Sequence, residues 1–294
     1  MTSQTDRPVL ITGGSTGIGR MTVELLASKG HQVYATVRKD KDFEELSKIE
    51  NVTPVKCDVT DLESISRLRD FVKEQAKGLY GLINNSGVTD LIAMTEMDDE
   101  DFDYIMKVNV YGPIRVTKAL HEFIIEAEGR IVNIGSVAGI VTPNLMGAYS
   151  ISKHAIEAYT DAIAWEMKKF NVHVSVIEPG NYKSNIAKSA GMRIINKVPD
   201  RRSSKYRAEF KEAIAIPNAT PERDQYPTPE PVADAIYHAL YDEQPLPRYM
   251  VVPNLEEAQE AIGEAAMNLA QFNKWQEYSF SRDELVAMLD KHLN

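Results

Sequence analysis

Tyr149 and Lys153 stand four residues apart, and Ser136 precedes Tyr149 by thirteen residues. On an α-helix, positions i and i+4 lie on one face, so this spacing can bring an ammonium group beside a phenol. A neighbouring cation favours loss of the phenol proton. A nearby hydroxyl can hydrogen-bond the substrate oxygen that takes up or gives back this proton. The three residues therefore indicate proton transfer, although an ordinary half-exposed surface pair has the same Tyr/Lys spacing.

A glycine-rich turn occupies residues 10–19, with the sequence Leu-Ile-Thr-Gly-Gly-Ser-Thr-Gly-Ile-Gly. Apolar β-branched residues precede it and an amphipathic stretch follows, which predicts a strand that runs through the turn into a helix. Glycine lets a ligand approach the backbone, and a helix N-terminus attracts phosphate. We therefore expect a dinucleotide here, whereas the motif alone is also compatible with simple turn chemistry. The candidate pyrophosphate-binding residues are Gly13, Ser15, Thr16, Gly17, Ile18 and Gly19.

The residues after the second and third predicted strands bear on the identity of that dinucleotide. Arg38 stands where a carboxylate would bind the ribose 2′-hydroxyl of NAD, and an arginine there accommodates the 2′-phosphate of NADP. NADP is therefore favoured over NAD, with a solvated strand-end charge as the alternative for Arg38. Asp58 and Val59 are placed to meet the adenine, unless Asp58 caps the following helix.

The elements that must position these residues alternate between short β-branched runs and longer amphipathic stretches. This alternation is typical of an α/β fold with a doubly wound parallel sheet, of the Rossmann type, covered by helices on both faces. Helix signals include Gly30 as a C-terminal stop, and Thr228 and Pro229 as cap and first residue of the last crossover helix. Seven strands are predicted, at residues 8–12, 32–37, 53–57, 81–84, 130–134, 173–177 and 249–252.

Composition excludes several classes of function. The chain has 294 residues, 43% of them hydrophobic, which suits one large domain, and its formal net charge of −10 argues against non-specific binding to nucleic acid or an anionic membrane. No basic segment with a following apolar stretch opens the chain, and no apolar run spans about 18 residues, so we expect a cytoplasmic protein with no membrane contact. Cys57, the single cysteine, is expected to be a small buried side chain, and the histidine spacing predicts no metal site.

Two segments interrupt the α/β alternation. Residues 184–231 form a long polar, proline-rich insertion, which we expect to belong to the substrate site and which could close as a lid. Residues 254–294 have helical periodicity, with a capping box at 281–284, and form a predicted C-terminal extension. We expect this extension to pack either on the catalytic domain, 1–253, or on a partner subunit.

Taken in order, these motifs resemble the short-chain dehydrogenase/reductase family over residues 8–253. The glycine turn is similar to the family's cofactor turn, Asp58 to its adenine contact, and residues 84–87, Asn-Asn-Ser-Gly, to its Asn-Asn-Ala-Gly segment. Ser86 departs from the usual alanine, which leaves the contacts there open. Further positions that match family motifs are Asn85 and Gly87 near the cofactor, Asn109 on a helix, the catalytic Ser136, Tyr149 and Lys153, and Pro179 and Gly180 on the nicotinamide side.

The resemblance implies hydride transfer between a nicotinamide and a carbonyl or alcohol carbon. Tyr149 would exchange the hydroxyl proton and also contact the cofactor, Lys153 would assist Tyr149 and hold the nicotinamide ribose, and Ser136 would bind the substrate oxygen. Asn109 would hold a water that links Lys153 to solvent, or simply be satisfied within its helix. Ser184 stands in for a threonine that reaches the nicotinamide carboxamide.

The substrate is expected to be a small, mostly apolar carbonyl or alcohol, because the loops at the strand ends carry few charges. The strand before Arg38 also faintly resembles family members that act on hydroxysteroids and retinoids. The candidate pocket residues, some of which could instead pack beneath the loops, are Val88, Leu91, Ile92, Met94, Ile140, Val141, Leu145, Met146, Met192, Ile194 and Ile195. The resemblance also implies a homodimer or homotetramer. The alternatives are a non-catalytic NADP sensor and an epimerase or dehydratase on the same scaffold.

Overall fold

The computed structural model describes residues 7–75, 77–184, 186, 204–209, 224–275 and 277–293. They fall into two compact units, Met1–Pro253 and Asn254–Asn294.

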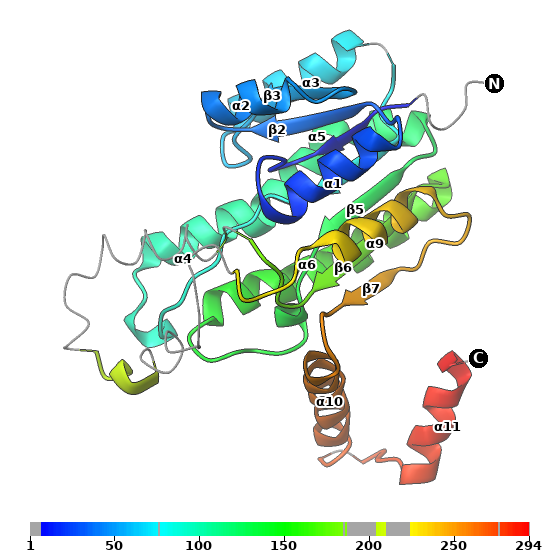
Figure 1. Ribbon diagram of the computed structural model, residues 1–294. Helices are drawn as coiled ribbons and strands as arrows, with labels where there is room; N and C mark the ends of the chain where they lie inside the picture. Colours follow the sequence, from blue (N-terminus) through cyan, green and yellow to red (C-terminus); the bar gives the residue numbers. More distant parts are fainter. Residues whose placement is uncertain are drawn as a thin grey trace. The chain divides into compact units, whose positions relative to one another are not determined.

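The first unit contains a seven-stranded sheet in which every strand pair is parallel (Figure 1). The strand order is β3-β2-β1-β4-β5-β6-β7, so the direction of winding reverses between β1 and β4. In such sheets ligands bind beyond the carboxyl ends of the strands at this reversal. The strands are β1 (Val9–Ile11), β2 (Val33–Val37), β3 (Val52–Lys56), β4 (Gly81–Asn84), β5 (Arg130–Ile134), β6 (His173–Pro179) and β7 (Arg248–Val251).

All seven predicted strands are confirmed, with small shifts at their ends. The fourth and fifth have the predicted bounds, and the others begin or end one or two residues away. The largest difference is in β6, which continues through Pro179 because Pro179 stays in register with Val251 and Gly180 N donates to Val251 O at 2.8 Å. The central strands are buried along their whole length, which explains their nearly continuous apolar sequences.

Helices cover both faces of the sheet, as a doubly wound fold requires. Figure 1 shows α1 and α9 over one face, where they contact each other, and α3, α5 and α6 belong to the other. Each face has its own apolar core, around Leu26 and Ile236 on the first and around Leu68 and Leu120 on the second. The helices of this unit are α1 (Gly17–Ser28), α2 (Asp40–Leu46), α3 (Leu62–Gln75), α4 (Asp99–Met106), α5 (Gly112–Glu126), α6 (Gly147–Met167) and α9 (Glu230–Tyr241).

Helix ends follow the sequence signals in one case and shift in another. Gly30 has φ +86° directly after α1, which is the left-handed conformation expected of a glycine stop. The predicted start of α9 is wrong by one residue, because α9 begins at Glu230 and Pro229 is its N-cap. Pro231 then occupies the first turn, where the missing N–H costs no hydrogen bond.

Cys57 is 5% exposed and belongs to the core around Leu68, as expected. Burial raises the pKa of its thiol to about 11, so the thiolate is scarce at neutral pH. The free thiol is therefore a core side chain rather than a nucleophile.

The second unit consists of two helices, α10 (Leu255–Phe272) and α11 (Arg282–Leu293). Asn254 caps α10, since its Oδ1 accepts from Glu257 N at 2.9 Å. The predicted capping box before α11 is present: Ser281 N donates to Glu284 Oε2 at 2.7 Å and Glu284 N to Ser281 Oγ at 3.3 Å. Where this unit packs stays a prediction. Among the helices that the structure describes, none has the length and apolar character of a membrane span.

Candidate active site

The glycine turn connects β1 to α1 at the reversal of the sheet. Gly13 and Gly17 have φ of +70° and +55°, a conformation that only glycine adopts without strain. Thr16, the N-cap residue of α1, makes no side-chain capping hydrogen bond, and the first turn of α1 carries no acidic residue. The N-terminal N–H groups of α1 are thus not met by a capping side chain, and an anion can bind them.

The segment after β4 packs against this turn. Asn85 Nδ2 donates to Thr12 O at 2.9 Å and to Gly13 O at 3.0 Å, and Thr12 Oγ1 accepts from Asn85 N and Ser86 N. Ser86 Oγ lies 2.9 Å from the position that a Cβ on Gly13 would take. The hydroxyl that distinguishes Ser86 from the family's alanine therefore packs against the glycine turn.

Gly19 permits the closest approach within the turn. A Cβ at Gly19 would lie 2.2 Å from Gly13 O and 2.5 Å from Asn85 Nδ2, so backbone must move to admit it. We expect Gly19→Ala to lower the free energy of unfolding by about 2–4 kcal/mol. Affinity for a nicotinamide dinucleotide should fall by at least roughly tenfold, because the N–H groups that would bind its pyrophosphate shift together. Thermal unfolding and fluorescence titration with NADPH measure the two effects.

The matched control for this substitution is Gly263→Ala in α10. A Cβ at Gly263 meets nothing within 4 Å, so the change should be neutral or stabilise the helix by about 0.5–1 kcal/mol. Equal losses in the two variants would show that the crowding around Gly19 is unimportant.

Arg38 and Asp58 lie beside each other at the ends of β2 and β3. Arg38 Nη1 is 3.8 Å from Asp58 Oδ2, and the Arg38 side chain is 60% exposed. A pair this exposed contributes little and leaves the guanidinium able to bind a ligand. The side chain of Val59, by contrast, is buried and packs 2.9 Å from the Cβ position of Gly112.

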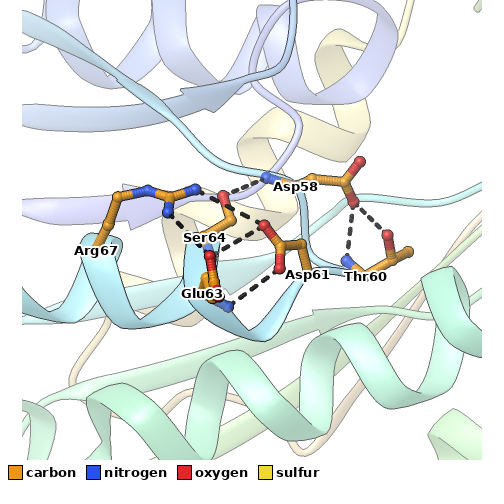
Figure 2. Close-up of polar contacts among 6 residues, drawn as sticks. All are labelled: Asp58, Thr60, Asp61, Glu63, Ser64 and Arg67. Carbon is orange, nitrogen blue, oxygen red and sulfur yellow. Dashed lines mark hydrogen bonds and ion pairs between the residues drawn. The ribbon is translucent and has the colours of Figure 1, made fainter.

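Figure 2 shows the turn that follows Asp58. Asp58 Oδ1 accepts from Thr60 N at 2.9 Å and from Thr60 Oγ1 at 2.7 Å. Asp61 caps α3, since its carboxylate accepts from Glu63 N and Ser64 N. The alternative that Asp58 caps the next helix is therefore wrong, and its Oδ2 faces Arg38 instead.

Tyr149 and Lys153 lie on the first turns of α6 with their side chains on one side of the helix. Lys153 Nζ is 5.5 Å from the centre of the Tyr149 ring. Tyr149 is 9% exposed and Lys153 is 5% exposed. The i, i+4 spacing therefore brings the phenol and the ammonium group together as predicted. The alternative of an ordinary surface pair is wrong, because both residues are buried.

The ammonium group of Lys153 is held by the end of β5. Lys153 Nζ donates to Ile134 O at 2.8 Å, and it lies 4.0 Å from the Cβ position of Gly87. Burial lowers the pKa of Lys153 to about 8, although Glu157 opposes the shift. At neutral pH the group is still a cation, in a site where little water screens its charge.

Ser136 follows β5 and caps the short 3-10 helix Val137–Gly139. Its Oγ accepts from Ala138 N at 3.1 Å, and the residue is 8% exposed. Because the N–H of Ala138 occupies an acceptor position of the hydroxyl, the Ser136 hydrogen can be donated to a ligand oxygen.

Asn109 lies in the π-helix Lys107–Tyr111. Its Oδ1 accepts from Val88 N at 2.8 Å, and its Nδ2 donates to Val88 O at 2.8 Å and to Ser152 Oγ at 2.9 Å. The side chain thus fixes the loop after β4 against α6. The water that we expected Asn109 to hold stays a prediction.

Pro179 is the last residue of β6, Gly180 follows it directly, and Ser184 lies four residues further on. Ser184 Cβ lies 3.2 Å from the Cβ position of Gly17, which places Ser184 beside the glycine turn. Its contact with a carboxamide stays a prediction. Met192, Ile194 and Ile195, named as pocket residues, lie outside the described residues, as do most of positions 184–231.

A cavity of about 390 Å³ opens at the N-terminal end of α6. It lies between the loops 92–95 and 142–147, and of the predicted pocket residues it includes Ile92, Met94 and Leu145. Tyr206 closes one side and accepts a hydrogen bond from Thr95 Oγ1 at 3.1 Å. Val88 instead belongs to the core around Leu68, so the alternative that it packs beneath the loops applies to this residue.

Sequence reasoning missed several residues that hold the candidate site together. Ser152 Oγ donates to Tyr149 O at 2.6 Å and accepts from Asn109, which links the two. Asp90 Oδ1 accepts from Tyr149 N at 3.2 Å. Ser152 was visible between Tyr149 and Lys153 as a small polar residue on a buried helix face, whereas nothing local marks Asp90.

The arrangement fits a dinucleotide. Glycines with positive φ line the turn, the N-terminus of α1 has no capping side chain, and Arg38 stands exposed at the end of β2. Lys153 lies beside Tyr149 and is bonded to Ile134 O at the end of β5, two residues before Ser136. The part of the chain that the structure describes holds no group of His, Cys, Asp or Glu suited to a metal ion.

Proteins of known family that are similar in sequence identify the family of this chain. The family model described as short chain dehydrogenase matches residues 7–193. Human 17-beta-hydroxysteroid dehydrogenase type 6 is 35% identical over 189 residues, which cover 62% of this chain and 58% of that protein. Human retinol dehydrogenase 16 is 33% identical over 257 residues, which cover 83% of this chain and 80% of that protein.

Among solved structures, a short chain dehydrogenase/reductase from Burkholderia phymatum in complex with NAD is similar, with a TM-score of 0.76 and 22% identity. The alignment covers 95% of this chain and all of the other, and it shows a shared fold. The chain spans 58% of the length of the hydroxysteroid relative. The family assignment therefore rests on the region of this chain that is matched. The family model covers more than half of the chain, and the chain belongs to the short chain dehydrogenase family.

Proposed function

We propose that this protein is an NADP(H)-dependent oxidoreductase that interconverts a carbonyl group and a primary or secondary alcohol. The observation that carries the proposal is the buried Tyr149 phenol beside the Lys153 ammonium. Lys153 donates a hydrogen bond to the last residue of β5, and Ser136 lies two residues after that strand. Family membership supports it, since relatives include hydroxysteroid and retinol dehydrogenases. When bound, the nicotinamide supplies or accepts the hydride.

The chain's own residues handle the proton and the developing charge. Ser136 donates its hydroxyl hydrogen to the substrate oxygen, which orients the carbonyl and stabilises negative charge on that oxygen. Tyr149 gives its proton to the same oxygen during reduction and takes it back during oxidation. The Lys153 cation stabilises the phenolate that reduction leaves on Tyr149, an effect strengthened by the burial of both residues.

Cofactor choice rests on Arg38. The residue directly after β2 is Arg38 and not a carboxylate, and its exposed guanidinium lies 3.8 Å from Asp58 Oδ2, so it can bind a 2′-phosphate. We expect Arg38→Gln to weaken NADPH binding by about 10–100-fold, the equivalent of one charged hydrogen-bonding group. NADH binding should change by less than about twofold, since NADH lacks that phosphate.

Lys39→Gln provides the control, because it removes the same charge from the adjacent exposed position. Fluorescence titration of both variants with NADPH and NADH separates a specific contact from general electrostatics. An equal loss in the two variants, or an equal loss for both cofactors, would contradict the assignment of Arg38.

The substrate is proposed to be mostly apolar. The cavity at the N-terminal end of α6 is lined largely by apolar side chains, including Ile92, Met94 and Leu145, and Gly147 in its wall lies two residues before Tyr149. The hydroxysteroid and retinol relatives act on apolar molecules by their names, which agrees with this lining. A substrate panel that gave turnover only with small charged carbonyls would contradict the apolar assignment.

The direct test is a panel of carbonyl and alcohol compounds, run in parallel with NADP(H) and NAD(H). We expect oxidation of NADPH with apolar ketones or aldehydes, and slower turnover with NADH. NADPH binding without turnover of any compound would instead identify a cofactor sensor.

A further inference from the structure

Two buried carboxyl groups lie directly behind the residues assigned to proton transfer. Glu157 is one helical turn after Lys153 on α6, and Glu178 precedes Pro179 in β6. Their side chains are only 14% and 5% exposed. Carboxyl groups are seldom so buried, because the ionised form loses its hydration. Neither group takes part in the proton transfer assigned to Ser136, Tyr149 and Lys153.

The side chain of Glu157 packs against the turn that carries Ser136. A Cβ on Gly135 would lie 2.8 Å from Glu157 Oε1, and a Cβ on Gly139 would lie 3.2 Å from the same atom. These glycines flank Ser136 on both sides, and Gly135 N donates to Ile177 O, next to Glu178. The carboxyl pair thus contacts the Ser136 turn, helix α6 near Lys153 and the end of β6.

The charges around the pair do not balance two ionised carboxylates. Arg248 of β7 has its Nε 3.4 Å from Glu157 Oε2 and 3.9 Å from Glu178 Oε1, but its closest contact is Nη2 to Asp161 Oδ1 at 2.7 Å. Lys153, one helical turn before Glu157, is a further cation that interacts with Glu157, and the segment 135–139 adds no titratable side chain. Arg248 therefore faces three carboxyl groups, one of which is exposed and two of which are buried.

A proton on the pair resolves this imbalance. Both carboxyl oxygens of Glu157 are buried and receive no hydrogen bond from the described residues. An ionised carboxylate in that position leaves its acceptors unsatisfied, whereas a protonated carboxyl group can donate to Glu178. Burial, and then the charge of Glu178, raises the pKa of Glu157, and burial likewise raises the pKa of Glu178.

We propose that Glu157 is a positioning residue that is held as the neutral acid, shares its proton with Glu178, and in that form supports the Ser136 turn and Lys153. Ionising both carboxyls would make them repel each other across the Ser136 turn and would draw the Lys153 ammonium away from Ile134 O. Only the assistance to catalysis rests on the proposed function, because the shared proton can be measured without a substrate.

Thermal unfolding between pH 5 and 8 tests the proton directly. A carboxyl whose pKa is raised by folding stabilises the folded state at pH values below its ordinary pKa. That stabilisation is lost as the pH rises through the raised pKa. The measured quantity is the Tm of the wild type minus the Tm of Glu157→Gln. We expect this difference to fall by roughly 5 °C as the pH rises from 5 to 8. Comparing the two proteins cancels the titration of histidines common to both.

Asp161→Asn is the matched control, since it removes a carboxylate from the same Arg248 at an exposed position of the same helix. Its Tm relative to the wild type should vary with pH far less, because the charge of Asp161 has the smallest influence on the pKa of Glu157, whereas Glu178→Gln should behave like Glu157→Gln. An infrared carboxylic-acid C=O band at pH 7 that Glu157→Gln lacks would support the shared proton independently. A pH-independent Tm difference for both glutamate variants, or no such band, would overturn the proposal.

Activity on a carbonyl found in the panel tests the positioning role. Gln has the shape and the donor of the neutral acid, so Glu157→Gln should keep kcat/KM at pH 7 within about threefold and extend activity to higher pH. Glu157→Ala should lose roughly tenfold or more, as the support beneath Ser136 disappears. Equal losses for Gln and Ala would show that the ionised form is needed, which would overturn the proposal. Absence of turnover in the wild type would contradict the proposed function alone.

Discussion

Replacing Tyr149 with Phe is expected to lower kcat for carbonyl reduction by about 10²–10⁴-fold, the range that general acid catalysis contributes. The substitution removes one oxygen atom from a side chain that is 9% exposed, and the ring can keep its place next to Lys153. Binding of NADPH should be nearly unchanged, since Gly13, Gly17 and Arg38 are untouched. The loss should therefore appear in kcat rather than in cofactor affinity.

Tyr159→Phe is the control on the same helix. The hydroxyl of Tyr159 is hydrogen-bonded to Thr117 and lies ten residues beyond Tyr149, so its removal should cost about 1 kcal/mol of stability at most and leave kcat within about twofold. Steady-state assays of both variants at saturating NADPH make the comparison. Comparable kcat values for Tyr149→Phe and the wild type would exclude Tyr149 as the proton donor.

Replacing Lys153 with Met should lower kcat by at least about 10²-fold, because the phenolate that reduction leaves on Tyr149 loses its cation. The same variant has a distinctive stability profile. Burial lowers the pKa of Lys153 to about 8, so above that pH the folded protein releases a proton that the unfolded chain keeps. Stability of the cofactor-free wild type should therefore gain a component that rises with pH between about 8 and 10, and Lys153→Met should lack it.

Lys168→Met, at the exposed C-terminal end of α6, is the control for charge removal. It should keep both the activity and the pH profile of the wild type. If chemical unfolding of Lys153→Met showed the same rise above pH 8 as the wild type, the buried ammonium would not be its source.

Much of the fold could be predicted because its signals are local. A strand buried on both faces reads as a short apolar run, and the helices between the strands show the 3.6-residue period, so all seven strands were located within two residues. The start of α9 was missed by one residue because Pro229 and Pro231 are equally good helix starters, and only the backbone decides between them. Asp58 and Asp61 are likewise equally good N-cap residues by sequence, and only the structure shows that Asp61 caps α3.

The candidate site was predictable only as far as its residues belong to an ordered set of motifs. Tyr149, Lys153 and the glycine turn combine spacing with chemistry, and the structure brings the groups of each motif together. Glu157 and Glu178 are different, because a glutamate on a helix normally faces solvent and β6 gives no sign that its own glutamate lies opposite. Their pairing depends on contacts between segments about twenty residues apart, which only the folded chain reveals.

The central claim is that this site transfers hydride to a carbonyl carbon while Tyr149 supplies the proton. The most direct test uses NADPH carrying deuterium at the transferable C4 position, with the best carbonyl compound from the panel. We expect deuterium on the carbinol carbon of the product with the wild type, and almost none over the same period with Tyr149→Phe. Tight NADPH binding with no deuterium in any product, or equal labelling by the two proteins, would contradict this claim.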